Sequence, residues 1–172
     1  MAHRLLIALL LIGTAARAQA FGSRGQIVPF GTVSYSHVSA GGNSADGLAL
    51  APGLMYFPTT SLAIGVQPVY AYNSGFGGGS VHILGFEPLV GFGVPLADRV
   101  AFFPRVGIQF SWQFPSPGNS SNQITMVGFA PLLYIPAPHF YIGFGPTVGV
   151  DLDSSFAKQT AFGIASEIGG YF

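Results

Sequence analysis

The sequence lacks several features that would point to common classes of protein. It has no cysteine, so an exported chain of this size is not a disulfide scaffold. Beyond residue 20 no apolar run approaches the ~20 residues that a membrane-spanning helix requires. Charged residues make up only 7% of the chain and form no basic patch, so we do not expect nucleic acid as a partner. A soluble domain with so few charges would struggle to cover its surface with polar groups.

The first twenty residues have the zones of a secretory signal peptide in the usual order. His3 and Arg4 supply a basic start, an apolar run follows, and residues 18–20 form a small-residue ending. The apolar run is too short to span a membrane as a helix. We therefore expect a cleaved signal peptide helix over residues 1–20 and a single mature domain over residues 21–172.

Hydrophobic residues are abundant, at 49% of the chain, and they are arranged with a period of two. One predicted strand shows the pattern clearly, with its larger apolar residues on one face: Val100, Phe102, Val106, Ile108, Phe110 and Trp112. This alternation is typical of β-strands. It recurs in eight segments of about ten to twelve residues, joined alternately by tight turns and by longer loops of Gly, Ser and Asn. We find no helical period and no second domain.

The pattern predicts an all-β fold, an eight-stranded antiparallel closed transmembrane β-barrel. An even number of strands, each near the ~9–11 residues that cross a bilayer, is typical of outer-membrane barrels. A soluble β-sandwich would need polar outer faces, whereas one face of the predicted strands is Leu, Phe, Val, Ile and Tyr. Seven prolines, which cannot donate to the ladder, share the expected lipid-facing phase and would form a belt at one level: Pro29, Pro52, Pro68, Pro88, Pro104, Pro131 and Pro146.

The chain ends in ASEIGGYF, with Ile168 and Phe172 in one phase. This ending is similar to the terminal-strand signal by which the insertion machinery recognises bacterial outer-membrane barrels, with Phe172 as the insertion signal. Gly170 stands where that signal usually has an aromatic residue. The mature chain as a whole resembles the small eight-stranded outer-membrane barrels of the OmpA and OmpX type.

The resemblance implies an integral membrane protein of the Gram-negative outer membrane, with both mature termini in the periplasm. The implied partners are outer-membrane lipids, the barrel insertion machinery and periplasmic chaperones, and the implied state is a monomer. The pattern is specific for a fold and says little about activity.

Two charged residues lie within apolar strands, where an unpaired charge is costly. A hairpin folded about residues 96–97 brings Glu87 and Arg105 opposite or diagonal to each other on the inner face. We expect a Glu87–Arg105 pair in the lumen, within a polar cluster that also contains Glu167, Gln67 and Gln109. The cluster is interpreted as a brace that fixes strand register, as a gate that opens for small solutes, or as an acid–base pair of the two glutamates.

Six aromatic residues are expected to point into the lumen near its periplasmic end and to form a stopper: Phe30, Phe57, Phe103, Tyr134, Tyr141 and Tyr171. An eight-stranded barrel is just wide enough for side chains to fill it, so six aromatic rings would close it. Toward the outside the expected inward residues are small or polar. That arrangement suggests a shallow cup open to the exterior, or strands drawn closer together with no cup.

The stretch His37-Val38-Ser39 has a His-x-Ser spacing. It resembles the spacing in lipid A deacylases, small outer-membrane barrels that carry these two residues on a lipid-facing surface. Here Ala40 follows instead of Asn, and we find no outward acidic partner, so an interfacial His beside a loop Ser is the other interpretation. His82 and His139 are expected at opposite ends of the barrel, so we predict no metal site and no cofactor.

Three functions remain open on the sequence. The first is a non-enzymatic structural or surface protein with a plugged lumen. The second is a narrow, porin-like channel, or a binding cup for small or apolar molecules, gated by the interior Glu87–Arg105 pair. The third is a lipid-modifying enzyme, which requires an acidic partner for His37 and Ser39 on the outer face.

Overall fold

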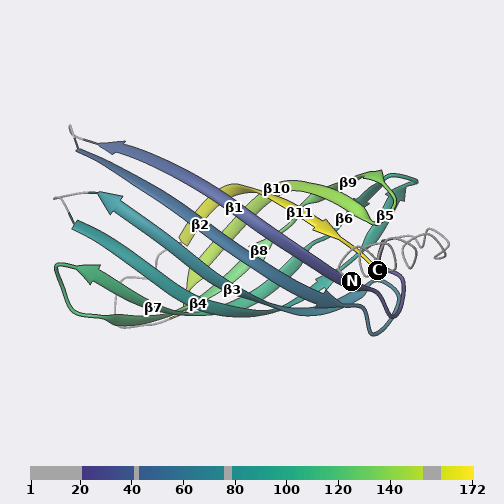
Figure 1. Ribbon diagram of the computed structural model, residues 1–172, viewed down its shortest axis with the longest axis horizontal. Helices are drawn as coiled ribbons and strands as arrows, with labels where there is room; N and C mark the ends of the chain where they lie inside the picture. The colour runs from purple at the N-terminus through teal and green to yellow at the C-terminus, as the bar shows by residue number, and fades with distance from the viewer. Residues whose placement is uncertain (1–20, 41–42, 76–78, 153–159) are drawn as a thin grey trace, which may run out of the picture.

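The computed structural model describes residues 21–40, 43–75, 79–152 and 160–172, so the predicted signal peptide lies outside the described residues. The strands in chain order are β1 (Ile27–Ala40), β2 (Asn43–Tyr56), β3 (Leu62–Gly75), β4 (Gly79–Phe92), β5 (Val94–Ala97), β6 (Val100–Phe102), β7 (Arg105–Ser116), β8 (Ser121–Phe129), β9 (Leu132–Ala137), β10 (Phe140–Asp151) and β11 (Thr160–Gly170) (Figure 1). No helix within the described residues is long and apolar enough to cross a membrane.

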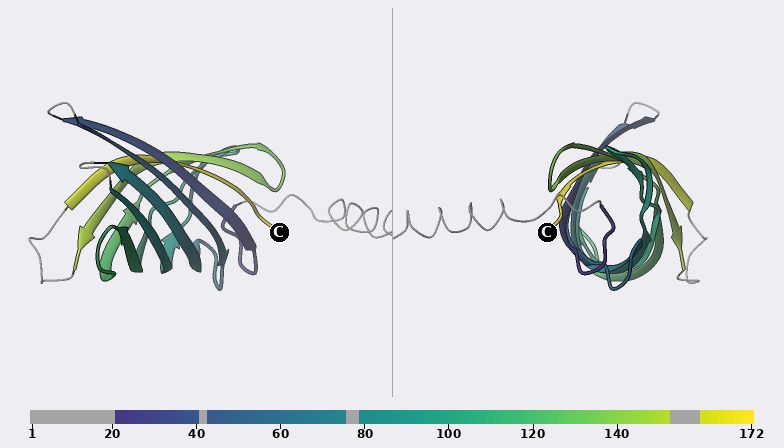
Figure 2. Two further views of the ribbon diagram at one scale, coloured as in Figure 1. Left: turned by 60° about the vertical axis from the view of Figure 1, so that its left-hand side comes forward. Right: turned by 90° about the vertical axis from the view of Figure 1, so that its right-hand side faces the viewer.

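The strands form one antiparallel sheet that closes on itself (Figure 2). β1 pairs with β2 on one side and with β11 on the other, and β11 also pairs with β10. Three long strands are each interrupted once, because β4 continues as β5, β6 as β7 and β8 as β9 after one or two residues. The sheet is therefore an eight-stranded closed barrel, and the predicted fold class is confirmed.

Both ends of the described chain lie at the same end of the barrel (Figure 1). The amide of Ile27 donates to the carbonyl of Phe172, and the amide of Phe172 donates back to the carbonyl of Ile27, each at 3.0 Å. The short turns at residues 57–61, 98–99 and 138–139 belong to this end. We call it the closed end, and the opposite end the open end.

The two faces of the wall differ as strand alternation requires. Val90 is 47% exposed on the outer face, whereas its neighbour Leu89 is 4% exposed in the lumen. Exposed aromatic residues lie toward both ends of the outer face: Tyr56, Tyr134, Phe140 and Phe172 near the closed end, and Trp112, Phe114 and Phe162 toward the open end. An apolar band between aromatic girdles is the surface that a transmembrane barrel presents to lipid.

The prolines interrupt the ladder, but they do not form a uniform lipid-facing belt. Pro104 is half-buried and Pro131 is buried, and the breaks in the β6–β7 and β8–β9 strands fall at these two residues. Their carbonyls still accept hydrogen bonds from the amides of Phe92 and Phe103, at 2.9 and 3.0 Å. The prediction is therefore wrong for Pro131, while the exposed members are Pro29, Pro52, Pro68, Pro88 and Pro146.

The strand made of β8 and β9 faces the opposite way from the prediction. Phe129 and Leu133 are buried in the lumen, and Tyr134 is 51% exposed on the outer face. The prediction placed the larger side chains outward, but both faces of this strand carry large apolar residues, so size does not distinguish them. Tyr134 is consequently not part of a lumen stopper.

Candidate functional site

Five aromatic residues fill the lumen at the closed end, with Phe21 at their centre. Its ring lies 5.3 to 5.8 Å from the rings of Phe57, Phe103, Tyr141 and Tyr171, edge to face in each case. This geometry is a preferred one for aromatic pairs. Each of the five side chains is at most 6% exposed. We call these five residues the aromatic plug, and it closes this end of the barrel.

The turn that follows Phe21 holds its ring in the lumen. Gly22 and Gly25 have φ angles of 89° and 87°, in the left-handed region that favours glycine. The side-chain oxygen of Gln26 accepts a hydrogen bond from the amide of Gly22 at 2.9 Å. The amide of Ser61 donates to the carbonyl of Gly22 at 2.8 Å. The segment from Phe21 to Gln26 is thus tied to the turn between β2 and β3.

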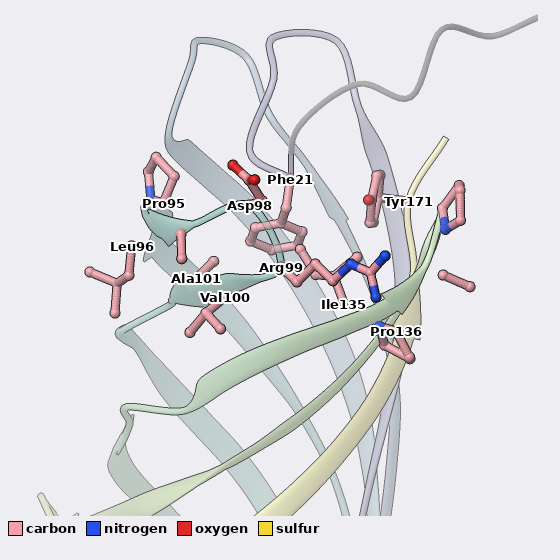
Figure 3. Close-up of a pocket in the computed structure, with 13 residues that line it drawn as sticks. Phe21, Pro95, Leu96, Asp98, Arg99, Val100, Ala101, Ile135, Pro136 and Tyr171 are labelled. Atoms are coloured by element: carbon pink, nitrogen blue, oxygen red, sulfur yellow. The ribbon is translucent and has the colours of Figure 1, made fainter.

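The plug differs from the predicted stopper in membership. Phe57, Phe103, Tyr141 and Tyr171 lie in it, whereas Phe30 is buried beside Arg105 and Tyr134 faces outward. Sequence reasoning missed Phe21, because this residue lies outside any strand and carries no alternation signal. Its position directly after the expected cleavage site was the available clue. Outside the plug, a recess of about 570 Å³ lies between the β5–β6 and β9–β10 hairpins, with Phe21 and Tyr171 among its lining residues (Figure 3).

Arg105 occupies the middle of the lumen, next to the plug. Its guanidinium forms an ion pair with the carboxylate of Glu167 at 2.5 Å, and both residues are buried. The guanidinium carbon lies 4.7 Å from the centre of the Phe30 ring and 4.7 Å from that of Phe129. A cation over an aromatic face is attracted to the ring, and more strongly when water is excluded. Arg105 is therefore held by one carboxylate and two rings.

Glu87 interacts with Gln67, and the predicted Glu87–Arg105 ion pair is wrong. The Gln67 amide donates to the Glu87 carboxylate at 2.8 Å, and the two residues are directly opposite in the β3–β4 register. The turn of the next hairpin lies at residues 98–99, two residues later than predicted. That shift places Arg105 opposite Gly91, four residues along β4 from Glu87.

The polar residues predicted for the lumen are otherwise found there. Gln67, Glu87, Arg105 and Glu167 are all buried, and Gln109 is half-buried on the lumen side of β7. They divide into two contacts, Gln67 with Glu87 and Arg105 with Glu167. A buried charge that is paired and hydrogen-bonded avoids most of the penalty of burial.

Inward glycines make room for the largest lumen side chains. A Cβ placed on Gly107 would overlap the carboxylate of Glu87, and one on Gly169 would overlap the phenol of Tyr141. In both cases the bulky residue leans over a glycine of an adjacent strand. The alternation of glycine and large residues on the inner faces therefore sets the packing of the lumen.

The lumen contains a cavity of about 490 Å³ on the open-end side of the plug, which we call the cup. Amides, hydroxyls and charges line its wall, from Gln67, Glu87, Arg105, Gln109, Thr32, Ser34 and Thr147. Closer to the open end Gln113 donates to Gln123 at 2.5 Å, and Gln123 donates to Asp151 at 3.2 Å. The polar groups of the cup share its lining with apolar side chains, among them Val69, Val127 and Phe129.

The register supplies an acidic residue beside the His-x-Ser motif. His37 on β1 is directly opposite Asp46 on β2, and Ser39 lies two residues further along the same face. Asp46 accepts a hydrogen bond from the hydroxyl of Tyr35, at 2.8 Å, and Tyr35 is 68% exposed on the outer face. The backbone register thus sets an acidic residue opposite the motif, which the sequence did not indicate.

The other histidines lie apart from each other. The His82 ring interacts with the hydroxyl of Tyr70 at 3.1 Å on the outer face. The His139 ring interacts with the carbonyl of Tyr171 at 2.8 Å, at the closed end. Within the described part of the chain, no three His, Asp or Glu side chains gather as metal ligands.

No protein-family model matches the chain, and no curated protein sequence matches it. Solved structures do. The N-terminal β-barrel domain of OprF from Pseudomonas aeruginosa matches with a TM-score of 0.51 at 11% identity, over 87% of this chain and 98% of that one. The outer membrane protein OprG from the same organism matches with a TM-score of 0.53 at 12% identity, over 87% and 97%. The chain has the fold of an outer-membrane β-barrel. At these identities the likeness concerns the fold, and the predicted resemblance to small outer-membrane barrels is confirmed at that level.

Proposed function

We propose that the protein is an integral outer-membrane barrel that neither conducts nor catalyses, and whose lumen is closed by the aromatic plug. The observation that carries the proposal is the contact of Phe21 with four aromatic rings at 5.3 to 5.8 Å. The interior of an eight-stranded barrel is only wide enough for side chains. The buried Arg105–Glu167 ion pair adds a second barrier beside the plug.

The proposal places the closed end in the periplasm and the cup toward the outside. Both ends of the mature domain and the short turns lie at the closed end. Outer-membrane barrels have short periplasmic turns and longer external loops. In this orientation the plug separates the cup from the periplasm, so the cup is a dead-end site.

The test is single-channel conductance of the refolded mature protein in a planar bilayer, beside an Arg105→Ala variant. Folding of both is checked first by the heat-dependent shift in gel mobility. Silence from both proteins supports the plugged barrel. Discrete openings of the wild type overturn it, and openings confined to Arg105→Ala would make the ion pair a gate.

A second candidate function is hydrolysis of a lipid ester at the outer face, favoured by the register that places His37 opposite Asp46. In this candidate the Ser39 hydroxyl oxygen attacks the acyl carbonyl, and His37 passes the hydroxyl proton to the departing alcohol. Water then releases the fatty acid from Ser39. Asp46 would orient His37.

The hydrolase candidate is tested by fatty acid release from outer-membrane lipid vesicles that contain the barrel. Release by the wild type and by a Ser44→Ala control, but not by Ser39→Ala, supports it. Equal release from all three proteins, or release from none, eliminates it. Ser44 is a suitable control because it lies opposite Ser39 in the register.

A further inference from the structure

The barrel wall is incomplete at the seam between its first and last strands. Pairing of β1 with β11 ends at Val33 and Ser166 after four residue pairs. β1 nevertheless stays paired with β2 as far as Ala40, and β11 stays paired with β10 as far as Thr160. Toward the open end β11 runs away from β1 (Figures 1 and 2). Among the described residues, neither strand therefore has a second neighbour there.

The cup extends through this seam. Its lining includes five consecutive residues of β11, 161–165, together with Ser34 and Tyr35 of β1. Consecutive residues of a strand face opposite sides of the sheet, so a cavity behind an intact wall would touch only every second one. Contact with both faces of β11 means that the cavity passes around the strand edge. We call this opening, bounded by Ser34, Tyr35 and residues 161–165, the lateral slot.

The rim of the lateral slot is apolar. Phe162 is 82% exposed and Ile164 is 66% exposed on the β11 side, and Tyr35 is 68% exposed on the β1 side. These residues continue the lipid-facing band, so the slot opens toward the hydrocarbon of the bilayer. Backbone groups without partners are tolerated at that depth only where they line a water-filled or protein-lined cavity, and the cup is such a cavity.

The interior of the cup favours an uncharged polar group. Gln67, Gln109 and Thr147 offer amides and a hydroxyl, whereas the cation among the lining residues, Arg105, is already paired with Glu167. The lining thus contains one carboxylate, Glu87, and one cation whose charge is already compensated by Glu167. An anionic head group would therefore meet repulsion and find no unpaired positive charge.

We propose that the cup binds an amphiphile that has one hydrocarbon chain and an uncharged hydrogen-bonding head, such as a long-chain alcohol, and that it enters from the membrane through the lateral slot. The head lies among the amides of Gln67 and Gln109, and the chain leaves over Phe162 and Ile164. The cup volume of about 490 Å³ is within the range of small-ligand pockets. The inference rests on the proposed closed lumen, which makes the cup a terminal site instead of a passage.

The experiment closes the slot and follows binding. Ser34 and Ala165 are the next residues in register beyond the last pair, so Ser34→Cys with Ala165→Cys bridges the strands once oxidised, in a chain without other cysteines. Ala49→Cys with Ala71→Cys is the matched control, because these residues are directly paired on β2 and β3. Ala165→Phe, which fills the slot without a bridge, is a second blocking variant.

Binding is measured in lipid nanodiscs by titrating 1-dodecanol and following the side-chain amide NMR signals of Gln67 and Gln109. We expect saturable shifts in the wild type and in the oxidised control pair, and at least tenfold weaker binding in the oxidised slot pair and in Ala165→Phe. Dodecanoate should bind at least tenfold more weakly than dodecanol, because Glu87 faces the cup and Arg105 is already paired. Tighter binding of dodecylamine than of dodecanol would overturn the choice of an uncharged head.

Three further results would overturn the inference. Shifts that never saturate would mean simple partitioning into the lipid, and equal binding with the slot closed would mean entry from the open end. If the wild type can be cross-linked into dimers in the nanodiscs and the variants with a closed slot cannot, the slot is occupied by a second copy of the chain. Conductance by the wild type would overturn the closed lumen and leave the slot result standing, so the two failures are distinguishable.

Discussion

Arg105 on β7 and Glu167 on β11 form their ion pair across the lumen, because these strands are not neighbours in the sheet. Side-chain contacts between adjacent strands join elements that the backbone hydrogen bonds of the sheet already hold together. A contact across the lumen instead ties two separate parts of the wall together. With Phe30 and Phe129 on the guanidinium, the pair links four strands of the barrel.

Removing one partner of this pair should destabilise the barrel more than removing both. Arg105→Met leaves the Glu167 carboxylate buried without its cation, which costs about 3–5 kcal/mol of the free energy of unfolding. Arg105→Met combined with Glu167→Gln should cost less than Arg105→Met alone, because no uncompensated charge stays buried. The measurement is urea unfolding in lipid vesicles, followed by fluorescence of the single tryptophan, Trp112. Arg99→Met at the exposed turn is the control, and an equal loss in control and variant would contradict the prediction.

Gly107→Ala should destabilise the barrel through its effect on Glu87. The new methyl group would overlap the Glu87 carboxylate, and overpacking of this kind costs about 1–3 kcal/mol. Gly149→Ala is the matched control, since the nearest atom to its added Cβ is 3.6 Å away. The same unfolding measurement applies. If both alanine variants unfold at the same urea concentration, Glu87 does not need a glycine at position 107 for its packing in the lumen.

The fold was predictable because alternate residues of every strand face lipid and lumen, which gives the sequence a hydrophobic period of two. This period can be recognised without knowing which residues of neighbouring strands pair. The inward polar residues Gln67, Glu87, Arg105 and Glu167 could be found by phase alone, because each is polar within an otherwise apolar strand. Their pairing could not be found in this way. Which residues pair depends on where the turn falls, and a turn two residues later than predicted set Arg105 opposite Gly91.

Side-chain size failed as a guide where both faces of a strand are apolar. In the strand formed by β8 and β9, Leu133 faces the lumen and Tyr134 faces outward, although a rule based on size predicts the opposite. Phe21 was missed for a different reason, since a residue outside the strands has no phase. The lateral slot was also beyond prediction, because it arises from the length over which β1 and β11 pair.

Cysteine labelling should confirm the facing of β9 directly. A chain without cysteine allows single substitutions, and Tyr134→Cys should react with an apolar maleimide dissolved in the lipid at least tenfold faster than Leu133→Cys. The physical reason is exposure, because Leu133 is buried in the lumen, where the reagent cannot enter. Val90→Cys, which is lipid-facing, sets the rate of an accessible site. Faster labelling at residue 133 than at 134 would reverse the assignment of faces.

Phe21→Ala should weaken the closed end although the change lies outside every strand. The Phe21 ring contacts four aromatic rings and is 6% exposed, so its removal leaves a cavity at the centre of the plug. Truncation of a buried Phe costs about 3–5 kcal/mol. Phe162→Ala removes the same atoms from an outer-face position that is 82% exposed, and should cost much less. Urea unfolding of both variants in vesicles of one composition separates the two positions. Equal losses of unfolding free energy would show that Phe21 contributes no more than a ring exposed to lipid. A larger loss at residue 21 would make the first residue of the predicted mature chain a structural part of the barrel.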